Sequence, residues 1–326
     1  MIKTYLLKSI LLLIVLFLGV STLTAQYRSP KFSKEELNWS EYNLTGWRFG
    51  INIGMYFANN YCAQYYSGER FNENNIEYVL NNKYWYEEIV QELNSNRVYN
   101  SFDWLPPADY IPNFDEWKAQ YNVQDGEKAW WIYYPVEMKY NAAISPGFYA
   151  KYNFNNTTGI FLQTNYVELK TSGAFQLAID TVTYTSEPGY RTGFIRGKER
   201  RSTIDLGISK FYRTGKFTSI FIETGLTMNS TKVLENRIQI GRQEYNLVNN
   251  YSSGGYVPNS NGNTSEIYQG GIGFGIFLNG GLKFILNEQV SVDPGVSLYY
   301  KNLNLEGYSD FQPDLYAYVR LIFNLF

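Results

Sequence analysis

The fold is decided by one stretch of the sequence, Trp47-Arg48-Phe49-Gly50-Ile51-Asn52-Ile53-Gly54-Met55-Tyr56-Phe57. Every second residue from Trp47 to Phe57 is large and apolar, and the residues between them are polar, small or Tyr. A β-strand places alternate side chains on opposite faces, so this stretch predicts a strand with one fully apolar face. A transmembrane barrel needs such strands, because their outward side chains meet lipid and their inward side chains meet a polar lumen.

The same period of two recurs along the chain and predicts eight strands. Only the segment 159–169 alternates poorly, and Pro146-Gly147 and Pro294-Gly295 indicate bulges or bends within two strands. The predicted strands are 47–57, 142–154, 159–169, 203–212, 220–228, 271–286, 290–301 and 315–325. The predicted fold class is therefore all-β, an eight-stranded antiparallel transmembrane β-barrel with a large, partly helical extracellular insertion between strands 1 and 2.

The connections between these strands are alternately short and long. Short turns are expected at 155–158, 213–216 and 287–289, and long loops at 58–135, 183–199, 230–266 and 303–312. Short turns at one rim and long loops at the other are typical of an outer-membrane barrel with both termini in the periplasm. A soluble β-sandwich would instead carry a polar outer face.

The amino-terminal segment has the pattern of a secretory signal peptide. Lys3 and Lys8 precede an apolar run over 10–20, which is too short for a membrane helix of about 20 residues. The expected organisation is a signal peptide at 1–25, a periplasmic segment at 26–45, and a barrel at 46–326 into which an extracellular lid is inserted at 58–135.

The composition excludes several classes of function. The 326 residues include no His and a single cysteine, Cys62, which excludes His-based catalytic triads, His-ligated metal sites and an internal disulfide. The net charge of −2 gives none of the basic excess of a nucleic-acid binder. We therefore expect no catalytic residue, no metal, no cofactor and no nucleic-acid partner.

The chain resembles a known family of membrane proteins. The signal peptide, the alternating strands and the terminal strand Leu315–Phe326 resemble the small bacterial outer-membrane β-barrels of the OmpA/OmpX type and the PorT-like type. The resemblance spans the chain after the signal peptide, but its motifs are generic. It implies that Phe326 is the signal read by the barrel-assembly machinery. One departure from the family pattern is that the alternate residues counted back from Phe326 include Asn324 and Arg320 instead of being all apolar.

A charged network is expected inside the barrel. An eight-stranded barrel is just wide enough for side chains to fill, and enclosed charges must be paired because burying an unpaired charge is costly. The alternation points these side chains inward: Arg48, Lys151, Asp205, Glu223, Lys283, Asp293, Lys301 and Arg320. They form either a structural ion network or, because bases outnumber acids, a gated pore or an anion site.

The lid at 58–135 concentrates acidic and aromatic residues. It holds twelve acids and five bases, a net charge of −7, and helices are expected near 75–93 and at 113–121. Its tryptophans form either the core of the lid or an exposed binding surface; they are Trp85, Trp104, Trp117, Trp130 and Trp131. The loop at 183–199 and the residues after it are basic, and could pair with the lid, contact lipopolysaccharide phosphates, or simply be solvated.

These observations leave three functional hypotheses. The first is a non-enzymatic outer-membrane barrel that presents the lid to a partner protein or a surface ligand. The second is an accessory subunit of an outer-membrane secretion or assembly complex, as the PorT-like resemblance implies. The third is a narrow pore.

Overall fold

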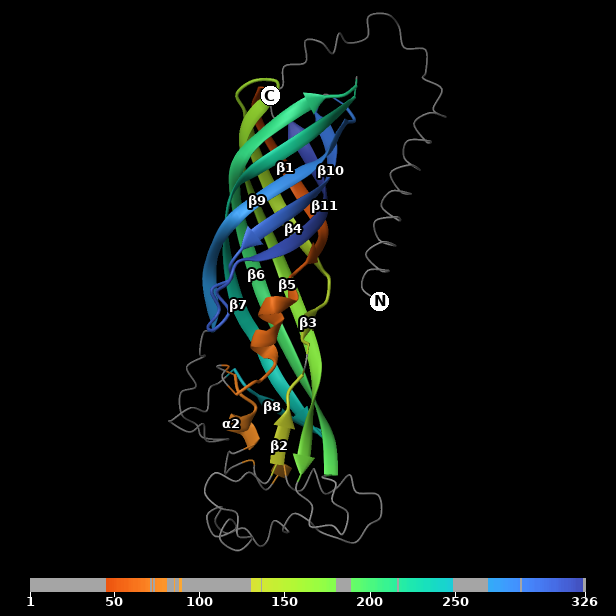
Figure 1. Cartoon of the computed structure of the whole chain (residues 1–326). Helices are drawn as coiled ribbons and strands as arrows, with labels where there is room; N and C mark the ends of the chain where they lie inside the picture. The colour runs from red at the N-terminus through yellow and green to blue at the C-terminus, as the bar shows by residue number, and fades with distance from the viewer. Residues whose placement is uncertain are drawn as a thin grey trace, which may run out of the picture. The chain divides into compact units, whose positions relative to one another are not determined.

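A computed structural model of the chain describes residues 45–70, 72, 74–80, 85, 88–89, 130–135, 137–179, 189–215, 217–248, 269–287 and 289–324 (Figure 1). All of them belong to one compact unit, Leu44–Phe326. The predicted signal peptide, the second lid helix at 113–121, Trp104, Trp117 and Phe326 lie outside the described residues, as does the periplasmic segment apart from Thr45.

Antiparallel strands close into a ring, which Figure 1 shows as a tube. Each strand of the ring pairs with the next one in the order β1-β4-β5-β6-β7-β9-β10-β11, and β11 pairs back to β1. The ring consists of β1 (Gly46–Phe57), β4 (Ala143–Asn153), β5 (Thr158–Ile179), β6 (Gly189–Arg213), β7 (Thr218–Ile240), β9 (Gly270–Ile285), β10 (Val290–Lys301) and β11 (Gln312–Asn324). The whole sheet has eleven strands because it also includes β2 (Trp130–Tyr133), β3 (Lys139–Tyr140) and β8 (Gln243–Asn246), which the sequence did not predict.

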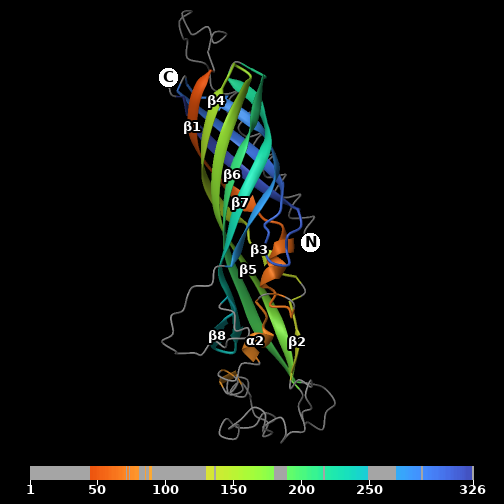
Figure 2. The same ribbon diagram turned by 90° about the vertical axis from the view of Figure 1, so that its left-hand side faces the viewer.

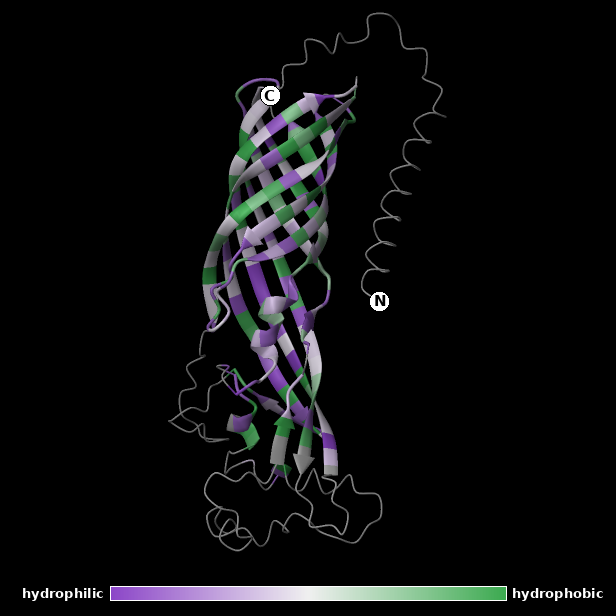
Figure 3. Ribbon diagram, in the orientation of Figure 1, coloured by the Kyte–Doolittle hydropathy of each residue, from purple (hydrophilic) through white to green (hydrophobic). Residues whose placement is uncertain are grey.

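The two faces of the ring differ as the alternation predicts. In β1, Trp47 and Ile53 are 55% and 59% exposed, whereas Arg48 and Asn52 between them are only 4% and 3% exposed. Figure 3 shows the resulting mixture of hydrophobic and hydrophilic residues along each strand. Every strand of the ring carries exposed apolar residues on its outward face, and together they form an apolar band that suits lipid and not water.

Three strands are much longer than predicted: β5 has 22 residues, β6 has 25 and β7 has 23. β5, β6 and β7 continue beyond the other strands of the ring, as Figure 2 shows. The predicted loop at 183–199 is therefore mostly strand, and the predicted loop at 230–266 begins with strand. Beyond the band, the outward side chains become polar, for example Lys170 and Arg200. The alternation of apolar and polar residues in the sequence therefore ends before the strand does.

We call the structure beyond the band the head, comprising the described residues of 60–80, 85–89, 130–140, 170–179, 189–199 and 232–248. β2 and β3 pair with β5, and β8 pairs with β7, which widens the head sheet. The 3-10 helix η2 (Asn60–Tyr66) and the helix α2 (Glu77–Leu80) also belong to it. Within the predicted helix 75–93, the described helical residues are the four of α2 and the pair Glu88 and Ile89, with a helical hydrogen bond from Ile89 N to Trp85 O of 2.9 Å.

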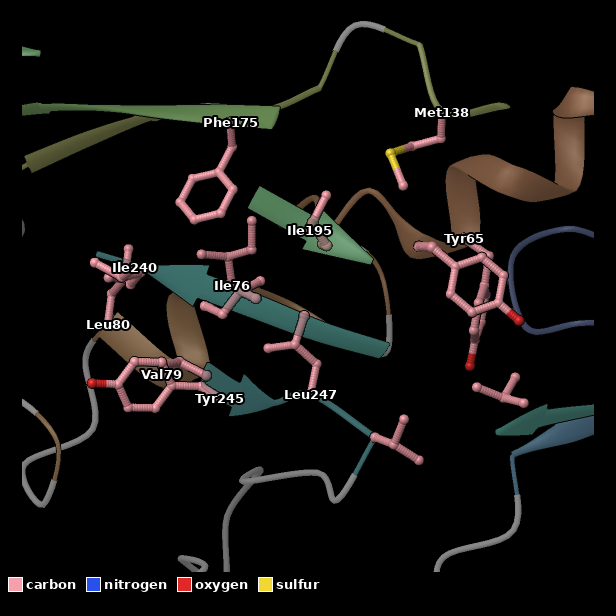
Figure 4. Packing of buried hydrophobic residues seen from close by; sticks show 14 of the residues in the cluster. Tyr65, Ile76, Val79, Leu80, Met138, Phe175, Ile195, Ile240, Tyr245 and Leu247 are labelled. Atoms are coloured by element: carbon pink, nitrogen blue, oxygen red, sulfur yellow. The ribbon is translucent and has the colours of Figure 1, made fainter. Parts of the chain in front are cut away.

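The head has a hydrophobic core of its own, separate from the lumen (Figure 4). Side chains from all its parts meet there, including Ile76 and Leu80 from the α2 region, Phe175 from β5, Ile195 from β6 and Ile240 from β7. Each of these five side chains is at most 2% exposed. Full burial of an aliphatic or aromatic side chain contributes about 1.5–3 kcal/mol, so this core gives the head a fixed structure.

The opposite rim carries the short turns. Phe154 N donates to Thr158 O at 3.0 Å, Thr214 N to Thr218 O at 3.2 Å, and Leu286 N to Val290 O at 3.0 Å. The first residues of β1 and the last residues of β11 pair with each other at this same rim. Among the described residues, no helix is both long and apolar enough to cross a bilayer.

Candidate functional site

The lumen holds the residues that the sequence analysis assigned to it. The structure places all eight side chains in the interior: Arg48, Lys151, Asp205, Glu223, Lys283, Asp293, Lys301 and Arg320, each at most 4% exposed. They come from seven strands of the ring, and inward positions on neighbouring strands lie opposite one another in the register. Six of them belong to three clusters, one nearest the short turns, one in mid-barrel and one nearest the head. Asp205 instead accepts from Thr227 Oγ1 at 2.6 Å and from Tyr299 OH at 2.8 Å.

The cluster nearest the short turns is basic. Lys283 Nζ lies 3.5 Å from Asp293 Oδ1 and donates to Ser291 Oγ at 2.7 Å, while Lys151 Nζ donates to Ser209 Oγ. Lys151 Nζ also lies 3.6 Å from the centre of the Phe211 ring. An aromatic face attracts a cation, so Phe211 compensates part of the charge that a single acid leaves unbalanced.

The middle cluster is centred on an ion pair. Arg320 Nη2 lies 3.2 Å from Glu223 Oε2 and donates to Gln163 Oε1 at 2.7 Å. Tyr149 OH donates to Glu223 Oε1 at 2.6 Å, and its ring centre is 3.7 Å from the Arg320 guanidinium carbon. Both charges are therefore paired and hydrogen-bonded, which is what a buried ion pair requires.

The cluster nearest the head includes residues that the sequence analysis did not assign to the lumen. Asp314 accepts from Tyr56 OH at 2.5 Å and lies 3.4 Å from Arg201 Nη1 and 3.7 Å from Lys301 Nζ. Arg201 belongs to the basic segment that follows the predicted loop at 183–199, and Asp314 lies one residue before the predicted strand 315–325. If the period of two is continued back from Thr203, it places Arg201 and Glu199 inside the barrel.

Glu199 connects this cluster to the head. It lies 2.5 Å from Arg201 Nε, and its other oxygen accepts from Tyr66 OH at 2.7 Å and from Tyr140 OH at 2.9 Å. Tyr66 belongs to η2, so the 3-10 helix is fixed across the mouth of the lumen. Burial, followed by the nearby Glu199 charge, raises the pKa of Tyr66 well above its usual value, so its hydroxyl keeps the proton that it donates.

Aromatic rings fill the space between the three clusters. Tyr149 and Phe161 are stacked with ring centres 5.4 Å apart, and Phe277 lies 5.8 Å from Phe161. The poor alternation of 159–169 is explained here, because Phe161, Val167 and Leu169 point inward and join this packing. The lumen is therefore a packed interior of rings and paired charges, as expected of a barrel this narrow.

The predicted lid tryptophans occupy different positions. Trp85 is 9% exposed and packs against Tyr245, with ring centres 5.3 Å apart, so it belongs to the head core and is not presented to solvent. Trp130 and Trp131 are in β2, opposite Ile179 and Ala178 of β5.

The head instead exposes other aromatic residues. Tyr133, Tyr190 and Phe194 are 55%, 51% and 54% exposed, and the rings of Tyr133 and Tyr190 are 6.2 Å apart. We call these three residues the aromatic patch. They lie outside the apolar band, so their exposure is not explained by contact with lipid.

Within the described ranges, no three His, Cys, Asp or Glu side chains are grouped so that they could hold a metal ion. The clustered carboxylates are already engaged by Arg, Lys and Tyr side chains.

Comparisons with known proteins give a resemblance in fold only. No protein-family model and no curated protein matches the chain. Among solved structures, the chain is similar to Ail, the attachment invasion locus protein of Yersinia pestis, with a TM-score of 0.30 and 9% identity over 85% of this chain and 96% of Ail. It is similar to the N-terminal β-barrel domain of Pseudomonas aeruginosa OprF (TM-score 0.29, 10% identity, 58% of this chain and 91% of that domain). It is also similar to the outer membrane protein OprG of the same species (TM-score 0.32, 12% identity, 61% of this chain and 83% of OprG). Such low scores and identities carry no inference about function.

Proposed function

We propose that this chain is a non-enzymatic barrel of the bacterial outer membrane that holds a folded head outside the cell for binding a partner protein. The apolar outer surface supports insertion in a membrane, and a signal peptide followed by a β-barrel fits the outer membrane. In the proposed orientation, the short turns and both termini are periplasmic, and the head is extracellular.

The observation that carries this proposal is the aromatic patch. Tyr and Trp faces are strong anchors at protein interfaces, and an exposed aromatic group outside the lipid marks an interaction surface. The patch lies on β2 and β6 of the head sheet, whose other face is covered by the head core. A partner would therefore bind a surface whose shape is fixed by the packing of the head core against the opposite face of the sheet.

The filled lumen argues against the pore hypothesis. Glu223 and Arg320 form a buried ion pair in mid-barrel, and the mouth is crossed by η2. A conducting path would need both to move.

The proposal is tested by photo-cross-linking on intact cells. The photoreactive amino acid benzoylphenylalanine is introduced in place of Tyr190 or Phe194, and in place of Tyr212 or Tyr300 as matched controls that are similarly exposed on the lipid-facing wall. We expect a discrete protein adduct from the patch positions and none from the controls. The absence of an adduct at the patch, or the same adduct at all four positions, would contradict a partner-binding head.

A further inference from the structure

The barrel wall is interrupted between β4 and β5. The two strands pair from Asn153↔Gly159 to Gly147↔Asn165, and the pairing stops at Pro146, although β4 remains paired with β1 as far as Ala143. Pairing with β5 resumes only at Tyr140↔Thr171 in β3. Pro has no N–H to donate, which makes it a natural end point for a ladder of hydrogen bonds.

A depression of about 910 Å³ lies in the outer wall at this interruption. Its lining comes from five strands, and the outward residues in its middle are small, namely Pro146, Thr164 and Ser202. Large apolar side chains border it, including Ile51 and Phe148, which are 52% and 71% exposed. Because it opens onto the lipid-facing surface, the occupant that it suits is a hydrocarbon chain.

A row of cations lies next to this depression on the side of the head. Tyr166 and Ser202, which line the depression, are opposite each other in the β5–β6 register, and the next outward pairs are Glu168↔Arg200 and Lys170↔Lys198. Each step of two residues along a strand is about 7 Å. The row therefore begins about 7 Å from the depression and continues for another 7 Å or so.

The row carries more positive charge than it can compensate. On β5 and β6 its three bases face one acid, Glu168, which lies 2.8 Å from Lys198 Nζ and 3.2 Å from Arg200 Nη2. On the other side, β7 places Glu235 opposite Lys198 and Lys232 opposite Arg200, two charges that cancel. Hydrogen bonds from Lys198, Tyr166 and Arg200 lower the pKa of Glu168 to about 2, so it stays ionised at neutral pH and the net charge of the row is +2. Lys170 and Lys198 lie directly opposite each other, and such like-charge pairs are destabilising unless an anion lies between them.

We infer that this part of the wall is a binding site for one phosphorylated, acylated lipid of the outer leaflet, of the lipid A type. An acyl chain occupies the depression at Pro146, and a headgroup phosphate binds Lys170, Lys198 and Arg200. Basic side chains next to apolar grooves at a membrane surface recognise lipid phosphates in this way, and Arg and Lys are the usual phosphate ligands. The inference requires a lipid-embedded barrel but not a partner for the head.

The site is tested by native mass spectrometry of the folded full-length protein in mild detergent. The probes are diphosphorylated lipid A and the same lipid A after enzymatic removal of its phosphates. We expect the phosphorylated form to bind at least about tenfold more tightly, since charge-assisted hydrogen bonds to phosphate are lost with the other probe.

Two variants separate the two halves of the site. Lys170→Gln combined with Lys198→Gln should weaken binding of phosphorylated lipid A at least about tenfold and leave the dephosphorylated form unaffected. Ser202→Trp, which fills the depression, should weaken both forms. Ser202→Leu replaces it if the Trp variant does not fold, and the faster migration of unheated samples on a denaturing gel checks folding.

The matched controls make comparable changes elsewhere on the outer wall. Lys210→Gln with Arg213→Gln removes two exposed bases at the short-turn rim, and Val296→Trp adds a ring on β10. Both should bind like the unmodified protein. Equal affinity for the two lipid forms, or an equal loss of binding in site and control variants, would overturn the inference. Neither result would affect the partner-binding proposal, which is read out on intact cells at the aromatic patch.

Discussion

At the scale of single residues, the charges inside this barrel have no access to water and are held by ion pairs, hydrogen bonds or aromatic rings. Removing one partner from a buried pair is more damaging than removing both, since the remaining charge is left uncompensated. The pair of Glu223 and Arg320 is the clearest case, because Arg320 is fully buried and Glu223 also accepts from Tyr149 and Asn279.

We predict that Glu223→Ala lowers the free energy of unfolding by about 3–5 kcal/mol, because it leaves Arg320 buried without its carboxylate. The measurement is urea unfolding of the protein refolded into lipid vesicles. The control is Glu235→Ala, which removes a surface carboxylate 3.7 Å from Arg237 Nε and should cost less than about 1 kcal/mol. A double variant, Glu223→Leu with Arg320→Met, should recover much of the loss. Equal stability of Glu223→Ala and Glu235→Ala would contradict a structural role for the pair.

At the scale of strands, a single long strand lies partly in lipid and partly in water. β6 is 25 residues long, and its outward face changes from apolar at Ile204, Leu206 and Ile208 to charged at Arg196, Lys198 and Arg200. The inward face hardly changes, since Arg201 and Glu199 are buried just as Thr203 and Asp205 are. The strand therefore leaves the lipid without ending.

This explains how much of the structure could be predicted from the sequence. Alternation located the lipid-facing strands and the lumen side chains, because lipid imposes an apolar outward face. It underestimated β5, β6 and β7, since a strand in water needs no apolar outward side chains. It also missed Arg201, although the alternation continued back from Thr203 would have placed this side chain inside. The contact of Tyr66 with Glu199 at the mouth joins distant segments and leaves no local pattern.

We predict that single cysteines on the outward face of β6 label at two different rates, with the change at Ser202, when the protein is embedded in lipid vesicles. Cysteine at Arg196 or Arg200 should react with a water-soluble maleimide at least about tenfold faster than cysteine at Leu206 or Ile208, because only a thiol in water forms the reactive thiolate. The native Cys62 gives little background, as it is 3% exposed and burial, chiefly, raises its pKa to about 12. Rapid labelling at Leu206 would contradict the position of the membrane boundary.

At the scale of the whole molecule, the lumen and the head form one supporting structure. Glu199 is bonded to Arg201 in the lumen and to Tyr66 and Tyr140 in the head, so the lumen side chains and the head are fixed to the same strands. A head built on strands that continue out of the membrane cannot swing freely relative to the barrel. Such a base keeps the aromatic patch at a fixed position above the membrane surface.

The same connection predicts that the inserted protein does not conduct ions. Water and ions would have to pass η2 at the mouth, the Glu223–Arg320 pair in the middle and the stacked rings of Tyr149 and Phe161. Moving a buried, paired charge aside costs several kcal/mol, so openings should be rare. In planar bilayers we expect no steps above the baseline, under conditions in which a wide porin barrel with an aqueous channel conducts as the positive control. Insertion is checked separately on the same sample by the faster gel migration of unheated protein. Regular conductance steps from the unmodified chain would show that the lumen opens, and would make the pore and not the head its principal function.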